Sequence, residues 1–404
     1  MTEYPIIAFM ALLLLTYGLL SKRAERSILT GPMFFVTIGI VMSFLPIELL
    51  PDGTKAPAVK ILAELTLMLV LFVDASTLDL KKLIRQRNLP VRLLSIGLPI
   101  TMLVGALIAI LLFPDERIWV LVLMALILSP TDAALGQAVV TGKQVPERIR
   151  QTINVESGLN DGIALPPILI CIAILSGPSA EESSTTYWLI FVMKQFLFGP
   201  VIGGLVGWLG GKVIEASSKR GWINHTFQRI ASLSLAILAF SLAESVHGNG
   251  FIAAYFAGMM LGTQVEEIRE RIREFGEAES QVMVLFIFLL FGLVLVPLAF
   301  PLWDWRVVLY AVLSLTFIRM IPVAISLIGA KLPLPTVWFI GWFGPRGIAS
   351  VLYLLMAVIQ LGTEGYEDMT SVITLTVLLS IFLHGITAVP FSKMFKTKDT
   401  MTEY

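Results

Sequence analysis

The chain has 404 residues, of which 56% are hydrophobic and only 14% are charged, and its mean hydropathy is +0.85. These values exclude an ordinary soluble domain and predict an all-α polytopic membrane protein. The formal net charge of zero gives no indication of a nucleic acid partner, and the single cysteine, Cys171, excludes an intramolecular disulfide.

Apolar stretches that approach the roughly 20 residues needed to cross a bilayer recur along the chain. They predict thirteen transmembrane helices, at residues 5–20, 28–46, 57–77, 91–113, 118–140, 150–176, 187–211, 228–246, 249–264, 281–300, 307–329, 336–360 and 369–391. We interpret the first stretch as a helix rather than a signal peptide, because its basic residues follow the apolar run.

Basic residues alternate between the two sides of this predicted topology. Most of the 29 Lys and Arg residues follow odd-numbered segments, whereas the connections that contain Glu181 and Glu364 are acidic. By the positive-inside rule, we expect a multi-pass protein of the cell membrane with its N-terminus outside. Residues 392–404 would form a short cytoplasmic tail.

Two acids interrupt the sixth segment. Residues 152–161 read Thr-Ile-Asn-Val-Glu-Ser-Gly-Leu-Asn-Asp, which places Glu156 and Asp161 at bilayer depth. An aspartate at the centre of a membrane helix costs about 2.5–3.5 kcal/mol even on the lowest scale. We therefore expect these acids to have a function.

Segments 5 and 12 each carry a proline beside an ion-capable side chain, in Ser129-Pro130-Thr131-Asp132 and in Gly344-Pro345-Arg346-Gly347. Proline removes a backbone donor and breaks a helix. Segments 6 and 13 also match, with Asp-Gly-Ile from Asp161 and His-Gly-Ile from His384. The pattern predicts two inverted six-helix repeats with crossed broken helices, the plan of secondary transporters with an ion site at the midplane.

These motifs, together with Glu-Ser-Gly-Leu-Asn-Asp from Glu156, resemble the monovalent cation:proton antiporters of the NhaP and Na+/H+ exchanger type, in the branch with an Asn-Asp pair. Phe72-Val73-Asp74-Ala75 is similar to the acidic position that the family has on segment 3. The resemblance covers the whole membrane domain. It implies a homodimer, with residues 1–89 and 228–300 as the dimerisation part, 90–176 and 306–391 as the ion-translocating core, and 187–211 as the linking helix.

Asp161 is the predicted ion carrier. Helix positions four apart share a face, so Ser157 lies beside Asp161. The Asp161 carboxylate, the Ser157 hydroxyl and the Thr131 hydroxyl or carbonyl offer hard oxygen ligands for Na+. One buried carboxylate can hold either a proton or a cation. This competition would exchange Na+ or Li+ for H+ by alternating access.

The resemblance implies roles for the neighbouring residues. Asn160 replaces a second acid, so exchange would be electroneutral and one for one, and its amide would hydrogen-bond Thr131. Glu156 needs a buried counter-ion. The family pattern nominates Arg346 for this, and Arg319 is the other candidate.

Two further acids keep two interpretations each. Asp132 would compensate the helix ends at the crossing or contact the ion directly. Asp74 would coordinate the ion or shape its field, or would be a charge near a cytoplasmic helix end.

The remaining polar and glycine positions favour structural roles. We interpret His384 as structural rather than proton-handling, and Glu64 as lining a funnel or meeting a neighbouring helix. The glycines from Gly199 to Gly211 predict close helix packing.

Three alternatives share parts of this pattern: a K+/H+ antiporter with the same chemistry, a cation channel, and a non-transporting membrane sensor. The few isolated intramembrane charges argue against a channel, and a sensor would more naturally carry a cytoplasmic domain. We expect a transporter rather than an enzyme, with a monovalent cation, H+ and membrane lipids as partners and no cofactor.

Overall fold

The computed structural model describes residues 4–24, 29–44, 57–77, 88–132, 144–177, 193–264 and 279–395, and the isolated positions 135, 139 and 190. All regular structure in these residues is helical. Among them, six helices are long and apolar enough to cross a membrane: Asn88–Leu112, Glu147–Leu175, His225–Ser245, Glu279–Leu302, Trp305–Ser326 and Glu367–Ser392. Shorter apolar helices accompany them, and the protein is a multi-pass membrane protein.

The N-terminal half begins with α1 (Tyr4–Ala24), α2 (Gly31–Ser43) and α3 (Pro57–Thr77). A continuous helix follows, made of α5 (Asn88–Arg92), a π-helical stretch (Leu93–Gly97) and α6 (Leu98–Leu112). It is succeeded by α7 (Ile118–Ile127) and the long α9 (Glu147–Leu175).

The C-terminal half contains α11 (Gly199–Lys219), which continues a π-helical stretch (Lys194–Phe198), then α12 (His225–Ser245) and α13 (Gly250–Gln264). The helix from residue 279 ends in a π-helical stretch (Phe291–Leu295), α15 (Val296–Ala299) and a 3-10 turn (Phe300–Leu302). The chain finishes with α16 (Trp305–Leu315), α17 (Phe317–Ser326), α18 (Leu334–Trp342), α19 (Ile348–Leu361), α20 (Glu367–Ser392) and a 3-10 turn (Lys393–Phe395).

Every predicted apolar segment overlaps one of these helices, although the boundaries differ. The helix of the fifth segment ends at Ile127, well before residue 140, and the eleventh segment is interrupted at Thr316, between α16 and α17. The number of spans and the inverted repeat stay predictions. Residues 78–87, 265–278 and 396–404, which carry much of the expected cytoplasmic charge and most of the expected tail, lie outside the described residues.

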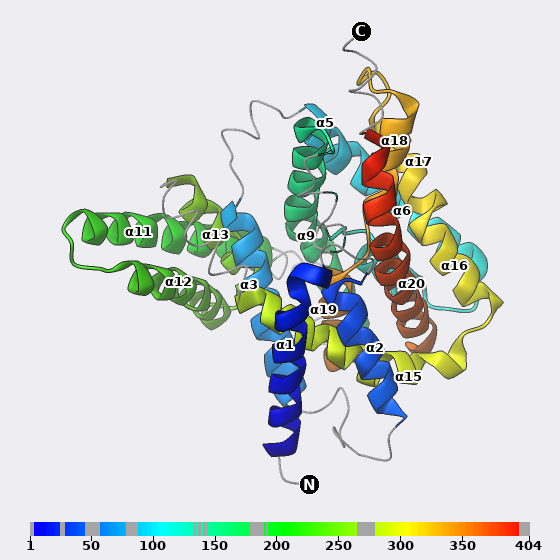
Figure 1. Cartoon of the computed structure of the whole chain (residues 1–404), viewed down its shortest axis with the longest axis horizontal. Coiled ribbons are helices and arrows are strands. Elements are labelled where there is room, and N and C mark those ends of the chain that lie inside the picture. Colours follow the sequence, from blue (N-terminus) through cyan, green and yellow to red (C-terminus); the bar gives the residue numbers. More distant parts are fainter. Residues whose placement is uncertain are drawn as a thin grey trace.

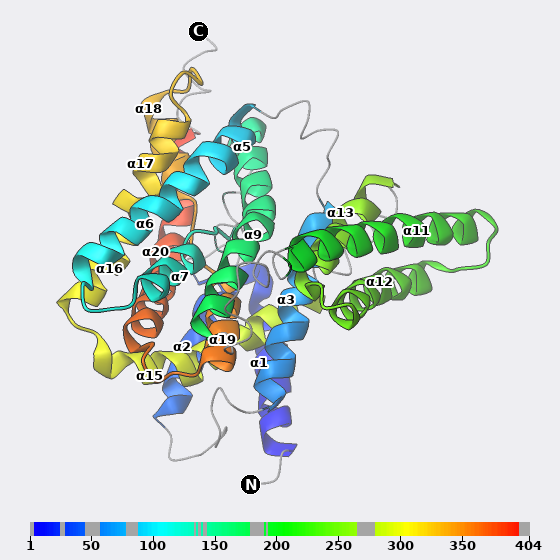
Figure 2. The ribbon, with the colours of Figure 1, turned by 180° about the vertical axis from the view of Figure 1, so that it is seen from behind.

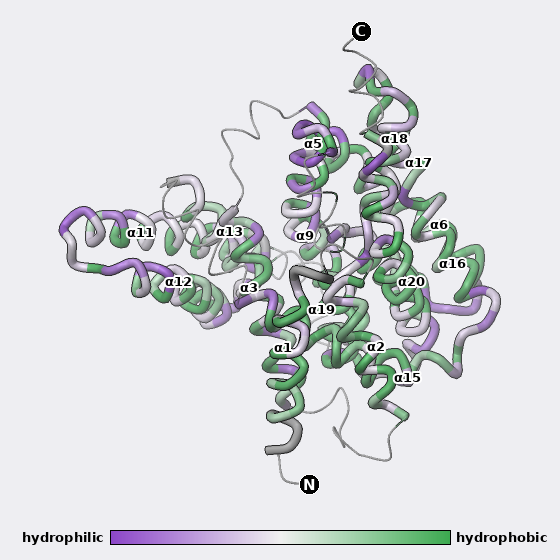
Figure 3. Tube along the Cα trace, viewed as in Figure 1, coloured by the Kyte–Doolittle hydropathy of each residue, from purple (hydrophilic) through white to green (hydrophobic). Residues whose placement is uncertain are grey.

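The helices form two groups (Figure 1). One contains α6, α9, α16, α17 and α20, and Figure 2 shows α6 running along α17, against which it packs. In the other, α11 and α12 project to the side and pack on α13, which packs on α3. The start of α1 and the end of α20 lie at opposite ends of the molecule. Figure 3 shows that α2, α6, α16 and α20 are predominantly hydrophobic along their length, as lipid-facing or buried helices require.

Glycines bring the helices of the second group into backbone contact. A Cβ on Gly203 or Gly207 of α11 would overlap the carbonyl of Ala253 or Ala257 in α13. The other side of α13 repeats the arrangement, because Gly258 and Gly262 lie against the carbonyls of Phe72 and Ser76 in α3. The predicted close packing of the glycine run is therefore present, in the small-residue mode of membrane helices.

Both predicted helix breaks are present. α7 ends at Ile127, and Pro130 lies in the non-helical stretch that follows. α18 ends at Trp342, α19 starts at Ile348, and Pro345 lies between them. Each break leaves backbone donors and acceptors without helical partners, and the two breaks meet in the middle of the first group.

Candidate ion-binding site

The two broken helices are joined by direct hydrogen bonds. The Asp132 amide donates to the Pro345 carbonyl (2.8 Å), and the Ser350 hydroxyl donates to the Ile127 carbonyl at the end of α7 (2.8 Å). Arg346 Nη1 donates to the carbonyls of Ser129 (2.7 Å) and Pro130 (3.1 Å). Polar groups that proline frees on one segment are thus satisfied by the other segment.

Asp132 caps the second of these helices. Its Oδ2 accepts a hydrogen bond from the Ile348 amide (3.0 Å) at the start of α19. Gly347 makes this approach possible, since a Cβ there would overlap the Asp132 carboxylate. A carboxylate at a helix N-terminus is stabilised by the helix dipole. The structure thus has Asp132 at a helix end, as expected, and its direct contact with an ion stays a prediction.

Asn160 and Ser157 attach α9 to the first break at one residue, Thr131. Asn160 Nδ2 donates to Thr131 Oγ1 (2.6 Å), which is the hydrogen bond expected from the sequence. The Ser157 hydroxyl donates to the Thr131 carbonyl (2.5 Å). Two of the predicted cation ligands, the Ser157 and Thr131 oxygens, therefore lie side by side, and all three residues are buried.

Asp161 lies one turn further along α9 and is 6% exposed. Its Oδ1 has no hydrogen-bond partner among the described residues. The Tyr353 hydroxyl of α19 donates to the Asp161 carbonyl (3.1 Å), and the Tyr255 ring of α13 packs against Gly162. One carboxylate oxygen thus remains available in a buried, polar setting.

Asp74 and Asp132 lie close enough to Asp161 to interact with it electrostatically. Among the described residues, no three His, Cys, Asp or Glu side chains lie close enough together to hold a metal ion. Asp74, Asp132 and Asp161 therefore do not form a shared ligand cluster. A cation beside Asp161 would therefore need oxygen ligands other than a carboxylate cluster, such as hydroxyl, backbone or water oxygens.

Of the two candidates for the counter-ion of Glu156, the first, Arg346, was wrong, and the second, Arg319, is the partner. Glu156 pairs with Arg319 of α17, with Nη1–Oε1 at 2.6 Å and Nη2–Oε2 at 2.8 Å, and both side chains are almost fully buried. Arg346 instead donates to the carbonyls of the first break. Gly344 leaves space for this pair, since a Cβ there would meet the Arg319 guanidinium. Room for Arg319 is therefore built into the second break.

Sequence reasoning missed the hydroxyl groups that support the site. Ser350, Tyr353 and Ser380 are buried and each bonds backbone of another helix or of a break. In the sequence, each of these residues is recognisable only as an isolated hydroxyl in an apolar segment. That pattern does not show which backbone group the hydroxyl bonds.

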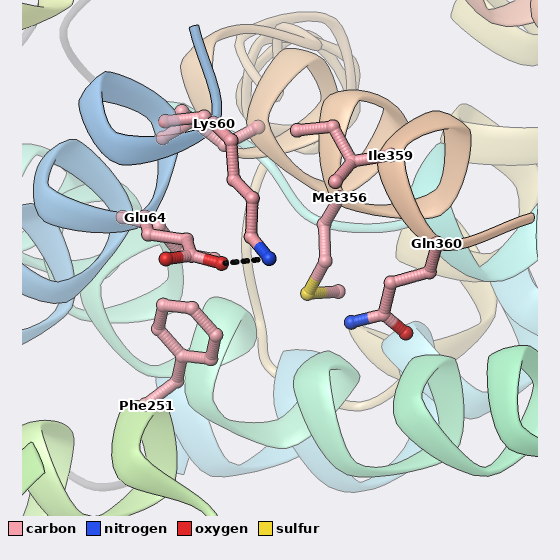
Figure 4. A pocket seen from close by; sticks show the side chains of 9 residues that line it. Lys60, Glu64, Phe251, Met356, Ile359 and Gln360 are labelled. Carbon is pink, nitrogen blue, oxygen red and sulfur yellow. Dashed lines mark ion pairs between the residues drawn. The ribbon is translucent and has the colours of Figure 1, made fainter. Parts of the chain in front are cut away.

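A small cavity of about 40 Å³ lies between α3, α13 and α19. Figure 4 shows Lys60 and Glu64 of α3 at this cavity, with Phe251 of α13 and Met356 of α19. Lys60 Nζ lies 3.8 Å from Glu64 Oε1, and both side chains are partly exposed. Glu64 therefore faces both a cavity and neighbouring helices, as the sequence suggested.

Comparisons with known proteins place this arrangement in a family. The family model for the transmembrane part of sodium/hydrogen exchangers matches residues 9–394. A K(+)/H(+) antiporter, NhaP2 of Shewanella oneidensis, is 27% identical over 278 residues, which is 68% of this chain and 47% of the relative. The chain thus spans about half the length of that relative. A Na(+)/H(+) antiporter of Schizosaccharomyces pombe is 25% identical over 314 residues, covering 70% of this chain and 66% of the relative.

The fold has a solved counterpart. The sodium proton antiporter MjNhaP1 from Methanocaldococcus jannaschii, determined at pH 8, matches 98% of this chain and 99% of its own with a TM-score of 0.80, at 21% sequence identity. At that identity the likeness concerns the fold alone. Because the family model extends over nearly the whole chain, including both broken helices and α9, the chain belongs to the sodium/hydrogen exchanger family.

Proposed function

We propose that the protein exchanges a monovalent cation, Na+ or Li+, for a proton, one for one, and that both ions compete for Asp161. The observation that carries this proposal is the buried Asp161 carboxylate, whose Oδ1 has no hydrogen-bond partner among the described residues. A carboxylate in that setting binds a proton or a cation in preference to remaining bare.

Three polar residues near Asp161 already have other partners, which supports a single exchanging acid. Glu156 has Arg319 as its counter-ion, Asp132 caps α19, and Asn160 is neutral and bonded to Thr131. One carboxylate that alternates between one proton and one monovalent cation moves no net charge in a complete cycle. Exchange would therefore be electroneutral.

The cation would be held by oxygens of Asp161, Ser157 and Thr131. Ser157 lies on the Asp161 face of α9 and already contacts the Thr131 carbonyl. Rotation of its hydroxyl would let both oxygens face a small dehydrated ion. Asp74, which interacts electrostatically with Asp161, would shape the field at the site or add a ligand.

Alternating access would move residues 90–176 and 306–391 against residues 1–89 and 228–300, the latter held in a homodimer, with residues 187–211 linking the two parts. Glycine-mediated packing of α13 on α3 supports a stiff second part, and the glycines of α11 fix the linking helix to α13. Two inverted repeats, thirteen spans, an outer N-terminus and a cytoplasmic C-terminus complete the proposed topology.

K+/H+ exchange is the second candidate. It is favoured by the name of the Shewanella relative, a K(+)/H(+) antiporter, whereas the yeast relative is named a Na(+)/H(+) antiporter. The same oxygen ligands serve either cation, and the size of the site decides between them.

The test is cation-driven pH change in proteoliposomes, with Na+, Li+ and K+ gradients imposed in turn and Asp161→Asn protein as the control. We expect Na+ and Li+ to alkalinise or acidify the lumen according to gradient direction, and Asp161→Asn to remain silent. A response to K+ alone would replace the Na+ proposal by its alternative. No response to any cation, from protein that is folded and reconstituted, would overturn exchange itself.

A further inference from the structure

His384 bridges the two sides of the second helix break. The residue is 1% exposed and belongs to α20. Its Nε2 lies 2.9 Å from the Trp342 carbonyl at the end of α18, and its ring stacks on the Trp342 indole at 4.8 Å between centroids. A carbonyl can only accept, so Nε2 carries the hydrogen in this contact.

The other ring nitrogen connects to the opposite side of the break through Ser380. His384 Nδ1 lies 3.1 Å from the Ser380 hydroxyl, which accepts a hydrogen bond from the Arg346 amide at 2.7 Å. With hydrogen on Nε2, Nδ1 accepts from that hydroxyl, so the chain of donors runs from the Arg346 amide to Ser380 and then to His384. In this tautomer the Ser380 carbonyl, 3.0 Å from Nδ1, is a close neighbour that makes no hydrogen bond to the ring. Two side chains of α20 therefore hold both Trp342 and Arg346.

Arg346 passes this restraint to the candidate ion site. Its guanidinium donates to the carbonyls of Ser129 and Pro130. The next residue is Thr131, which bonds both Ser157 and Asn160. A shift of Arg346 would therefore move the Thr131 oxygen relative to Asp161.

We propose that His384, with Ser380, is a positioning residue that sets cation affinity and size preference by fixing the unwound segment between Trp342 and Arg346. This inference rests on the proposed cation exchange at Asp161. His384 does not touch the ion, and its role needs no change of protonation. Loss of the bridge would loosen the break and let the Thr131 oxygen move.

Two variants remove the bridge in different ways. His384→Phe keeps a ring that can stack on Trp342 but has no hydrogen-bonding nitrogen. Ser380→Ala keeps His384 and removes only the hydroxyl between it and the Arg346 amide. His384→Gln is the conservative variant, since its amide can still donate toward the Trp342 carbonyl. The matched control is Thr376→Val, one turn before Ser380 on α20, because the buried Thr376 hydroxyl bonds the Val372 carbonyl of its own helix and no other group among the described residues.

The first measurement is the apparent KM and Vmax for Na+ and Li+ in proteoliposomes. We expect His384→Phe and Ser380→Ala to raise the KM for Na+ by about three- to tenfold, the effect of losing one buried neutral hydrogen bond, and to change the ratio of the Na+ and Li+ values. His384→Gln should recover much of the loss, and Thr376→Val should match the wild type. Variants that lowered only Vmax, in proportion to the folded protein present, would overturn the inference.

The second measurement is hydrogen exchange of the amides in residues 343–349, which does not depend on transport. Both bridge variants should exchange faster there than Thr376→Val, with unchanged exchange in α11. Unaltered protection of this segment would contradict the positioning role even if transport changed. If the wild type showed no exchange of any cation for protons, the proposed function would fail, and the protection data would still decide whether His384 fixes the break.

Discussion

Two regions of the molecule hold their helices together by opposite means. In the group formed by α3, α11 and α13, glycines such as Gly207 and Gly258 let helix backbones touch directly. At the crossing of the two broken helices, side chains such as Asp132 and Arg346 bond backbone groups that the breaks leave without helical partners. The first region is sensitive to added volume, whereas the second is sensitive to the loss of single polar atoms.

This difference would suit the moving core and the fixed dimerisation part of the proposed alternating access. Backbone contact over several turns leaves few ways to rearrange, because close-packed interfaces do not deform gradually. Unwound backbone that is held by side-chain hydrogen bonds can change partners at modest cost. The proposed ion site would therefore lie in the part of the core that can rearrange, and substitutions in the two regions should have different effects.

The largest expected effect is at Asp161. Asp161→Asn mimics a permanently protonated acid, so cation-driven proton movement should be lost completely while the protein remains folded. Fluorescence of a trapped pH dye would measure transport, and thermal unfolding in detergent would measure folding. Asp115→Asn, in the exposed loop between α6 and α7, is the matched control and should transport normally. Near-normal exchange by Asp161→Asn would remove the carrier assignment.

The ion pair inside the core should give the largest change in stability. Arg319→Ala leaves Glu156 buried without its counter-ion, which typically costs about 3–5 kcal/mol. Adding Glu156→Gln removes the stranded charge and should restore part of the melting temperature. Strictly additive losses in the double variant would show that the two side chains do not depend on each other. Arg346→Ala gives a comparison, since Glu156→Gln should not rescue it.

Two nearby glycines of α11 test the contrast between the glycine-packed helices and the crossing. Gly207→Ala places a methyl group against the Ala257 carbonyl and should lower stability by about 1–3 kcal/mol, as overpacking does. Gly204→Ala meets only the end of the Met260 side chain, at 3.9 Å. It should be neutral or stabilise by up to about 1 kcal/mol, through helix propensity. The KM for Na+ should not change in either variant. Equal melting temperatures for the two would contradict close backbone packing.

The smallest effect is expected outside both regions, at Glu116 in the loop before α7. Partial burial, and then the nearby Asp368, raise the pKa of Glu116 above 4.5. The folded state therefore binds this proton more tightly than the unfolded state, and stability is lost as pH rises from the unfolded pKa through the folded value. Glu116→Gln should thus stabilise the folded state by less than about 1 kcal/mol at pH 7, seen as a slightly higher melting temperature, and should have no effect at pH 4. A difference that is the same at both pH values would rule out titration as its cause.

Local chemistry decided which features the sequence could predict. Pro130 and Pro345 predicted both breaks, because proline has no backbone N–H to donate to the preceding turn of a helix. The Asn160 bond to Thr131 followed from the motif. The partner of Glu156 could not be derived, because it depends on how α17 approaches α9 and on the space at Gly344. The bridge from His384 to Trp342 and Arg346 could not be derived either, because it depends on how α20 packs against the break between α18 and α19.

The central claim, one proton for one cation at Asp161, is tested most directly by membrane potential. Proteoliposomes with equal Na+ and equal pH on both sides receive a K+ diffusion potential through valinomycin while internal pH is recorded. The same K+ gradient without valinomycin reports any K+/H+ exchange, and an imposed Na+ gradient shows that the vesicles are active. Electroneutral exchange predicts no pH change driven by the potential in vesicles that respond to Na+. Proton flux that requires the potential, Na+ and the protein would contradict the one-for-one cycle.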